Sequence, residues 1–223
     1  MDLYLGRLTL HENLFYATRE IGRLYETGRY LHNYALTYAL GLASAPYFTA
    51  EQAPRYAGQL GLLNERGIYV TPARGVHLSY ALSTFKYGDN AYHVEMEKGS
   101  RNTPSYGRAK ELAVGSVFQF AVLGPRDLRL PTWVRLGLWR SKAQVIWHHA
   151  EMRARPAAVA EASLPINPLD VPVAFHSFDL ISMPPSSLLD HVTLRGDWLL
   201  AEIEGETWQL PAGMAYRFPT GVA

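Results

Sequence analysis

The stretch from Leu8 to Leu42 constrains the fold of this chain more than any other part of it. It opens with alternating apolar residues, as a β-strand does, and then crosses a loop that carries Arg19 and Arg23. Beyond the loop, apolar side chains recur at the spacing of one helix face: Leu31, Tyr34, Ala35, Tyr38, Ala39 and Leu42. A strand, a basic loop and a buried helix in this order predict the first βα unit of an α+β fold, with the loop at its rim. Binding residues usually lie on such loops.

The rest of the chain is predicted to be rich in strands. A long hairpin is expected over residues 87–122, with strands at 93–97 and 117–122. Two further strands are expected to meet at a tight turn between Trp133 and Trp147. Prolines at 156, 165, 168 and 172 predict an irregular connection, and short strands are expected after it at 173–182, 191–203 and 206–210. The chain therefore divides into a main domain, residues 1–155, and a small β-rich C-terminal region, residues 156–223.

Charge is unevenly distributed along the chain. Residues 98–155 hold eleven basic and three acidic side chains, whereas residues 156–223 hold two basic and eight acidic ones. A basic middle segment indicates a binding surface for a polyanion such as a nucleic acid. The alternative is that the opposite charges pair with one another inside the fold.

Two parts of the basic segment are candidate binding elements. The connecting stretch of the hairpin carries Lys98, Arg101, Arg108 and Lys110 on a background of Gly, Ser, Asn and Pro, with Tyr106 able to stack on a base. The tight turn places Arg140, Ser141 and Lys142 beside Gly137, where the absent side chain lets another backbone approach closely. Arginine matches the geometry of phosphate, and lysine adds a mobile charge. For the hairpin, ordinary solvated surface charge is the competing interpretation.

The sequence carries no catalytic or cofactor signature. There is no cysteine, P-loop, GXGXXG or GXSXG motif. His148, His149 and Glu151 resemble part of a metal site, but adjacent strand residues point to opposite faces, so no metal and no cofactor are expected. No signal peptide or membrane-length apolar run is present, which predicts a soluble cytoplasmic protein without a membrane partner. His11 could serve as a general base or be an ordinary loop histidine.

Two runs carry a family resemblance: LHENLFYATREIGRLYETGRYLHNYALTYALGL, residues 10–42, and RLGLWRSKAQV, residues 135–145. Both resemble the five-type Cascade subunit of type I-D CRISPR effector complexes, a member of the RAMP superfamily. The resemblance implies a ferredoxin-like (RRM-like) domain with an inserted thumb hairpin at about 87–122 and a small C-terminal β subdomain. The turn departs from the superfamily pattern, because it has Gly137 alone where a glycine-rich loop is usual.

The function implied by the resemblance is that of a non-catalytic, RNA-binding subunit in antiviral defence. Such a subunit caps the 5′ handle end of the CRISPR RNA and contacts the backbone filament subunit and the large subunit. The implied RNA-binding residues are Arg19, Arg23, Lys98, Arg101, Tyr106, Arg108, Lys110, Gly137, Arg140, Ser141 and Lys142. The sequence leaves open whether the chain also touches target DNA near the protospacer-adjacent motif.

Two other functions remain in competition. One is a metal-independent endoribonuclease that processes repeat RNA, with His11 as base and Lys142 stabilising the developing charge. The other is an α+β protein that binds a small molecule and whose charge distribution is coincidental.

Overall fold

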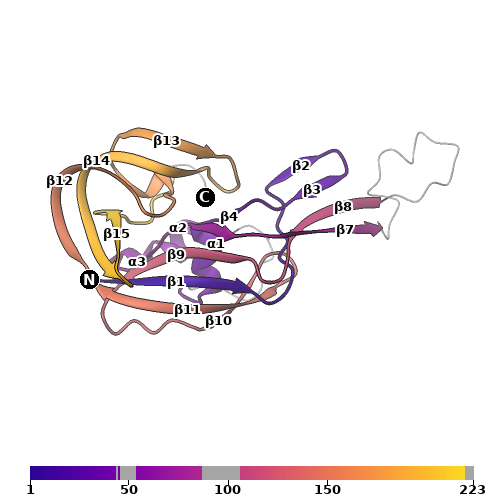
Figure 1. Ribbon diagram of the computed structural model, residues 1–223, viewed down its shortest axis with the longest axis horizontal. Helices are drawn as coiled ribbons and strands as arrows, with labels where there is room; N and C mark the ends of the chain where they lie inside the picture. The colour runs from indigo at the N-terminus through magenta and orange to yellow at the C-terminus, as the bar shows by residue number, and fades with distance from the viewer. Residues whose placement is uncertain (44, 46–53, 87–105, 219–223) are drawn as a thin grey trace, which may run out of the picture.

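A computed structural model describes residues 1–43, 45, 54–86 and 106–218 of the chain. They form a β-rich α+β fold with three sheets and short helices (Figure 1). The coarse fold class expected from the sequence is therefore confirmed.

The largest sheet has seven strands and contains the main core. Its strands lie in the order β10 (Trp133–Leu136), β11 (Ser141–Glu151), β1 (Asp2–Leu10), β9 (Val117–Gly124), β6 (Ala73–His77) and β4 (Tyr30–Leu31), and β5 (Tyr69–Val70) also pairs with β9. β1 is central because it pairs antiparallel with both β11 and β9 along its length. Its side chains are almost continuously buried, as is usual for a strand covered on both faces.

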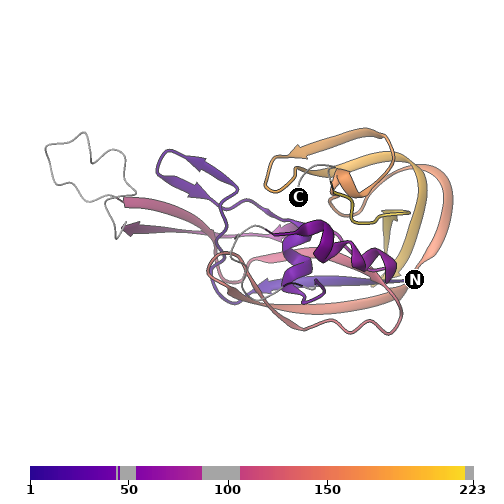
Figure 2. The same cartoon turned by 180° about the vertical axis from the view of Figure 1, so that it is seen from behind.

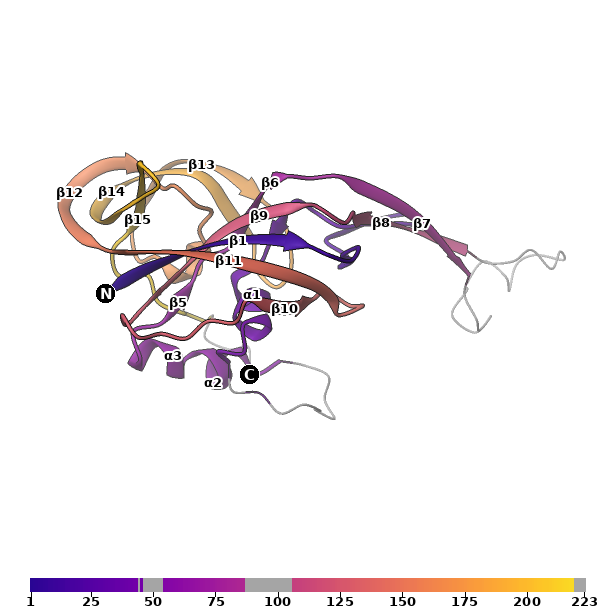
Figure 3. The ribbon, with the colours of Figure 1, turned by 60° about the horizontal axis from the view of Figure 1, so that its bottom comes forward.

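Three short helices cover one face of this sheet: α1 (Asn33–Ala39), α2 (Tyr56–Leu60) and α3 (Leu62–Glu65) (Figures 2 and 3). α1 begins two residues later than its apolar stripe, because the side chain of His32 caps the helix by accepting from the backbone N–H of Tyr34. Leu36 is buried although it is not part of the stripe, whereas Ala35, which is part of it, is exposed. The stripe is thus only partly a core-facing surface.

A second sheet of four strands extends away from the main body (Figure 1). Its order is β2 (Arg19–Ile21), β3 (Leu24–Glu26), β8 (Tyr106–Leu112) and β7 (Tyr80–Lys86). The predicted pairing of the hairpin is wrong: β7 and β8 pair with each other, and residues 117–122 belong to β9 of the central sheet. The expected strand at 93–97 lies outside the described residues. Residues 117–122 are apolar except for Gln119, which fits a doubly covered central strand better than a projecting hairpin. The prediction fails there for that reason.

The C-terminal part forms a third sheet, in which β14 (Leu188–Ile203) pairs with β12 (Arg153–Glu161), β13 (Phe175–Ile181) and β15 (Glu206–Pro211). The three strands predicted here are confirmed, although β14 begins at Leu188 and, with 16 residues, is not short. The irregular connection is shorter than expected, because residues 156–161 continue β12 across the predicted domain boundary. A small separate core contains Trp198, while Trp208 and Tyr216 join the main core.

Candidate nucleic-acid interface

The four-stranded sheet brings together five of the predicted binding residues. Arg19 lies in β2 and Arg23 in the turn before β3, and Tyr106, Arg108 and Lys110 lie on β8. β3 pairs parallel with β8, so that Leu24 lies opposite Arg108. A loop and a hairpin that are far apart in the sequence therefore form one surface. Lys98 and Arg101 lie outside the described residues.

Glu26 organises two of these cations. One carboxylate oxygen accepts a 2.6 Å bond from Lys110 Nζ, and the other accepts from the guanidinium of Arg19, whose Nε lies 3.0 Å away. The bonds from Lys110 and then from Arg19 lower the pKa of Glu26 below its usual value. Two cations on one carboxylate leave a net positive charge, held in a fixed position. This cluster does not realise the alternative in which the basic middle segment pairs with the acidic C-terminal segment, because Glu26 belongs to neither segment.

The other predicted binding residues of this sheet, Arg23, Tyr106 and Arg108, are exposed. The guanidinium carbon of Arg23 is 5.3 Å from the centre of the Tyr106 ring, close enough for a cation–π contact. Tyr106 is 41 % exposed, and the side chain of Arg108 is exposed beside it. An exposed ring flanked by arginines is the arrangement that proteins use to stack a nucleobase next to a phosphate.

The turn between β10 and β11 occupies residues 137–140 and packs against the segment that follows β1. The backbone N–H of Leu138 donates to the carbonyl of Phe15 at 2.9 Å, and the hydroxyl of Ser141 donates to the carbonyl of Asn13 at 2.6 Å. Ser141 is buried, so its hydroxyl holds the turn in place. Arg140 and Lys142 are exposed. The segment 11–18 also pairs with β8, because Leu14 and Leu112 exchange backbone hydrogen bonds, and it therefore joins the turn to the projecting sheet.

Gly137 permits the backbone of Phe15 to approach closely, as expected for a residue without a side chain. Its φ is +69°, and a β-carbon there would lie 2.5 Å from the carbonyl oxygen of Phe15. We expect Gly137→Ala to lower the free energy of unfolding by more than the ~1–2 kcal/mol of left-handed strain alone. Gly213→Ala is the matched control, since Gly213 has φ +73° but no atom within 4 Å of a β-carbon. Denaturant unfolding of both variants measures the difference, and equal losses would show that the close approach to Phe15 is unimportant.

The two residues of the nuclease hypothesis also meet at this turn. Lys142 Nζ lies 4.4 Å over the ring of Trp133, and the ring of His11 meets the same indole edge-on at 4.9 Å. The backbone N–H of His11 donates to the carbonyl of Lys142. Both side chains are exposed, so a candidate base and a cation lie near each other. The contacts described for the His11 side chain include no hydrogen-bonding group that would orient its imidazole.

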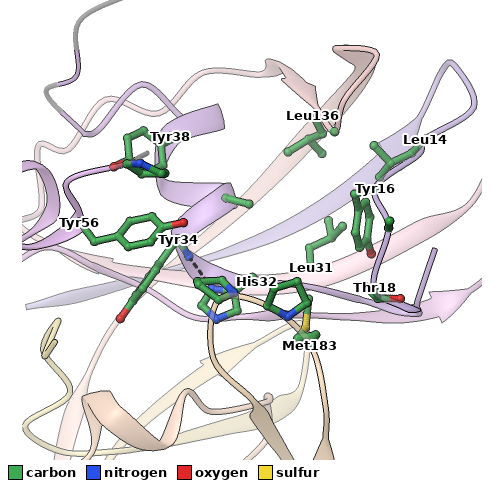
Figure 4. A pocket seen from close by; sticks show the side chains of 16 residues that line it. Leu14, Tyr16, Thr18, Leu31, His32, Tyr34, Tyr38, Tyr56, Leu136 and Met183 are labelled. Carbon is green, nitrogen blue, oxygen red and sulfur yellow. Dashed lines mark hydrogen bonds between the residues drawn. The ribbon is translucent and has the colours of Figure 1, made fainter. Parts of the chain in front are cut away.

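A pocket of about 250 Å³ lies between α1, the segment 14–18 and residues 183–185 (Figure 4). No pattern in the sequence indicates it. Its walls are mostly aromatic or apolar and include these side chains: Leu14, Tyr16, Leu31, His32, Tyr34, Tyr38, Tyr56, Leu136 and Met183. Leu31, Tyr34 and Tyr38 among them belong to the apolar stripe that the sequence assigns to the core.

His32 is the main polar group of the pocket and is fixed by two contacts. Its Nε2 lies 3.0 Å from the hydroxyl of Ser186, and its Nδ1 accepts from the N–H of Tyr34. Burial lowers the pKa of His32 to about 4, so the imidazole is neutral at pH 7. His32 therefore has a structural role at the base of the pocket and does not attract anions by charge.

The histidines considered for a metal site are engaged separately. His149 Nε2 lies 2.6 Å from an Asp2 carboxylate oxygen, and His148 Nδ1 lies 3.3 Å from one of Glu204. Among the residues that the structure describes, no group of three His, Cys, Asp or Glu side chains is placed to hold a metal ion. Within the same ranges, no helix has the length and hydrophobicity needed to cross a membrane.

Fold and site together define a β-rich α+β protein with a projecting basic sheet and an adjacent basic turn. The chain belongs to the family described as type I-D CRISPR-associated protein Cas5/Csc1, whose model matches residues 1–219. The family resemblance noted in the sequence is therefore confirmed. No curated protein matches the chain. A solved structure titled "Crystal structure of a CRISPR protein from Archaeoglobus fulgidus" aligns with a TM-score of 0.39 and 11 % sequence identity, over 95 % of this chain and 100 % of the other.

Proposed function

We propose that this chain is a non-catalytic RNA-binding subunit of a type I-D CRISPR effector complex, in which it holds the 5′ handle end of the CRISPR RNA. The observation that carries the proposal is the convergence of Arg19, Arg23, Arg108 and Lys110 on one projecting sheet beside an exposed tyrosine. Such a surface suits the backbone and splayed bases of single-stranded RNA. Membership of the Cas5/Csc1 family supports CRISPR RNA as this polyanion.

We also propose that the central sheet and α1 form the core of a ferredoxin-like fold. The chain order β1, α1, β6, β9, β11 and the spatial order β11-β1-β9-β6 support a ferredoxin-like core. Residues 125–140, which include β10, stand where that fold has its second helix. The β7–β8 hairpin, extended by β2 and β3, is the thumb.

Contacts with other subunits are proposed for the C-terminal sheet. Val159, Phe178 and Leu180 expose 60 %, 47 % and 64 % of their surfaces on its strands. Val159 lies on β12 and the other two on β13, the strands on either side of β14. Exposed apolar side chains that gather on one sheet are characteristic of protein interfaces. We assign this sheet to contacts with the backbone filament subunit or the large subunit.

The turn provides a direct test of RNA binding. Replacing Arg140 and Lys142 by alanine is expected to weaken binding of single-stranded handle RNA. The slope of the logarithm of affinity against the logarithm of salt concentration should also become smaller, by roughly 0.7 for each phosphate that the variant no longer neutralises. Fluorescence anisotropy at several salt concentrations measures both quantities. An unchanged slope would show that the two cations serve only the fold of the turn.

The endoribonuclease alternative is tested by incubating the purified protein with repeat RNA in the absence of metal. We expect the RNA to remain intact. Specific cleavage that disappears in His11→Ala would contradict the non-catalytic role, because His11 is the candidate base next to Lys142.

A further inference from the structure

We propose that β7 is the contact edge of a reversible dimer, in which the β7 strands of two copies of this chain pair antiparallel and join their projecting sheets. β7 is an outer strand of that sheet, since it pairs with β8 and with no other strand among the described residues. The outer edge of such a strand carries backbone N–H and C=O groups that serve as a template for a further strand. The inference concerns self-association and does not depend on the proposed function.

β7 lacks the features that usually protect an edge strand, which are short length, proline, charge and bulges. It is seven residues long, contains no proline and keeps an unbroken register with β8 throughout. Its one charged residue, Lys86, is its last. Tyr80 and Leu82 expose 43 % and 60 % of their surfaces. A regular, nearly uncharged edge with exposed apolar side chains is one that an added strand stabilises.

The other outer strands of the described ranges are protected. β2, β4, β5 and β10 have only two to four residues each. β12 contains Pro156 and a shift in register, and β13 has two such shifts. The backbone N–H of Ser163 donates to the carbonyl of Gln209 on β15 at 3.0 Å, so that strand is covered. The contrast singles out β7 as the edge built to be paired.

The side chains of β7 complement those of a second β7 related by a two-fold axis at Ser83. In this register Leu82 of one copy lies opposite Thr84 of the other, and Ala81 lies opposite Phe85. A large side chain therefore meets a smaller one at each of these pairs, as cross-strand packing requires. Residues 80–85 carry no charge, so two such edges meet without repulsion. An uncharged edge does not select a partner of opposite charge, whereas every copy of the chain supplies this complementary strand.

The cations of the projecting sheet do not oppose the pairing. Arg108 and Lys110 lie on β8, so in the dimer the two β8 strands are three strand spacings apart, about 14 Å. Charges at that distance are largely screened, because the Debye length is about 8 Å at physiological ionic strength. The two-fold axis is perpendicular to the combined sheet and keeps these cations of both copies on the same side. The dimer edge is therefore separate from the surface assigned to RNA.

Sedimentation velocity over a concentration series, with the chain freed of nucleic acid, tests the inference. One pair of seven-residue strands is small beside the ~1,200–2,000 Å² of stable interfaces, so we expect a monomer–dimer equilibrium with a micromolar dissociation constant. Leu82→Lys and Thr84→Glu, both at exposed positions, should each raise this constant about tenfold or more, because each dimer carries the substitution twice. An equimolar mixture of the two variants should dimerise again, since the introduced lysine then faces the introduced glutamate.

Leu180→Lys on β13 is the matched control, because it makes the same change at a leucine that is 64 % exposed on another sheet. An unaltered chain that stays monomeric would overturn the inference, as would a dimer that Leu82→Lys leaves intact or that Leu180→Lys weakens equally. A monomeric mixture of the two β7 variants would overturn it as well, because recovery there shows that both are folded and correctly paired. If the free chain is monomeric and hydrogen exchange finds the β7 amides protected only in the assembled complex, a strand of another subunit occupies the edge.

Discussion

Replacing Asp190 by alanine is expected to lower the free energy of unfolding by about 3–5 kcal/mol, the typical cost of removing one partner of a buried ion pair. Asp190 is fully buried in β14, and its carboxylate lies 3.1 Å from a guanidinium nitrogen of Arg74 on β6. The hydroxyl of Tyr30 on β4 donates to its other oxygen at 2.9 Å. The carboxylate therefore joins the C-terminal sheet to the edge of the central sheet. Its removal leaves the phenol without this acceptor and the guanidinium with the carbonyl of Ser163 in place of a carboxylate.

Thermal unfolding should show the loss as a fall in melting temperature of roughly 10 °C, at ~2–4 °C per kcal/mol for a chain of this size. Asp179→Ala is the matched control on the same sheet. Asp179 faces His191 at 2.8 Å, but both side chains are more than half exposed, so its loss should cost less than about 1 kcal/mol. Equal effects of the two substitutions would show that Asp190 does not join the sheets as described.

The second large effect concerns RNA affinity. Replacing Arg23, Arg108 and Lys110 together by alanine is expected to weaken binding of handle RNA by a factor of about 10²–10³, since each hydrogen bond to a charged group is worth roughly 1.5–3 kcal/mol and the contributions overlap. The salt slope should fall by about 2, or roughly 0.7 for each of three phosphates. Binding isotherms at several salt concentrations measure both.

A triple alanine variant of Arg153, Arg155 and Arg195 is the matched control. It removes the same charge from exposed positions on β12 and β14, at the far end of the molecule from the projecting sheet (Figure 1). If both triple variants lose affinity equally, the RNA responds to net charge and the projecting sheet is not a specific surface.

Local features of the fold could be predicted from the sequence because they depend on local patterns. The strand β1, the strands on either side of the Gly137 turn and the three C-terminal strands all lie where periodicity and turn residues predict them. The prediction of close backbone approach at Gly137 is confirmed as well. The strands require knowledge only of neighbouring residues, whereas the backbone that approaches Gly137 belongs to Phe15, which is distant in the sequence.

Long-range pairing could not be predicted in the same way. The parallel register of Leu24 with Arg108 joins segments that no local pattern connects, so nothing in the sequence combines the Arg19 loop with the hairpin. The pocket escapes prediction for a related reason. The stripe of Leu31, Tyr34 and Tyr38 defines an apolar face, but periodicity does not say whether protein or a cavity lies against it.

The RNA content of the assembled complex tests the central claim most directly. The chain is expressed together with the other subunits and a CRISPR array, the complex is purified through this chain, and the absorbance ratio and a denaturing gel report the nucleic acid present. We predict one RNA species of defined length that remains bound after high-salt washing and is strongly depleted in the Arg23, Arg108 and Lys110 triple variant. A complex that contains this chain but no RNA would contradict the account.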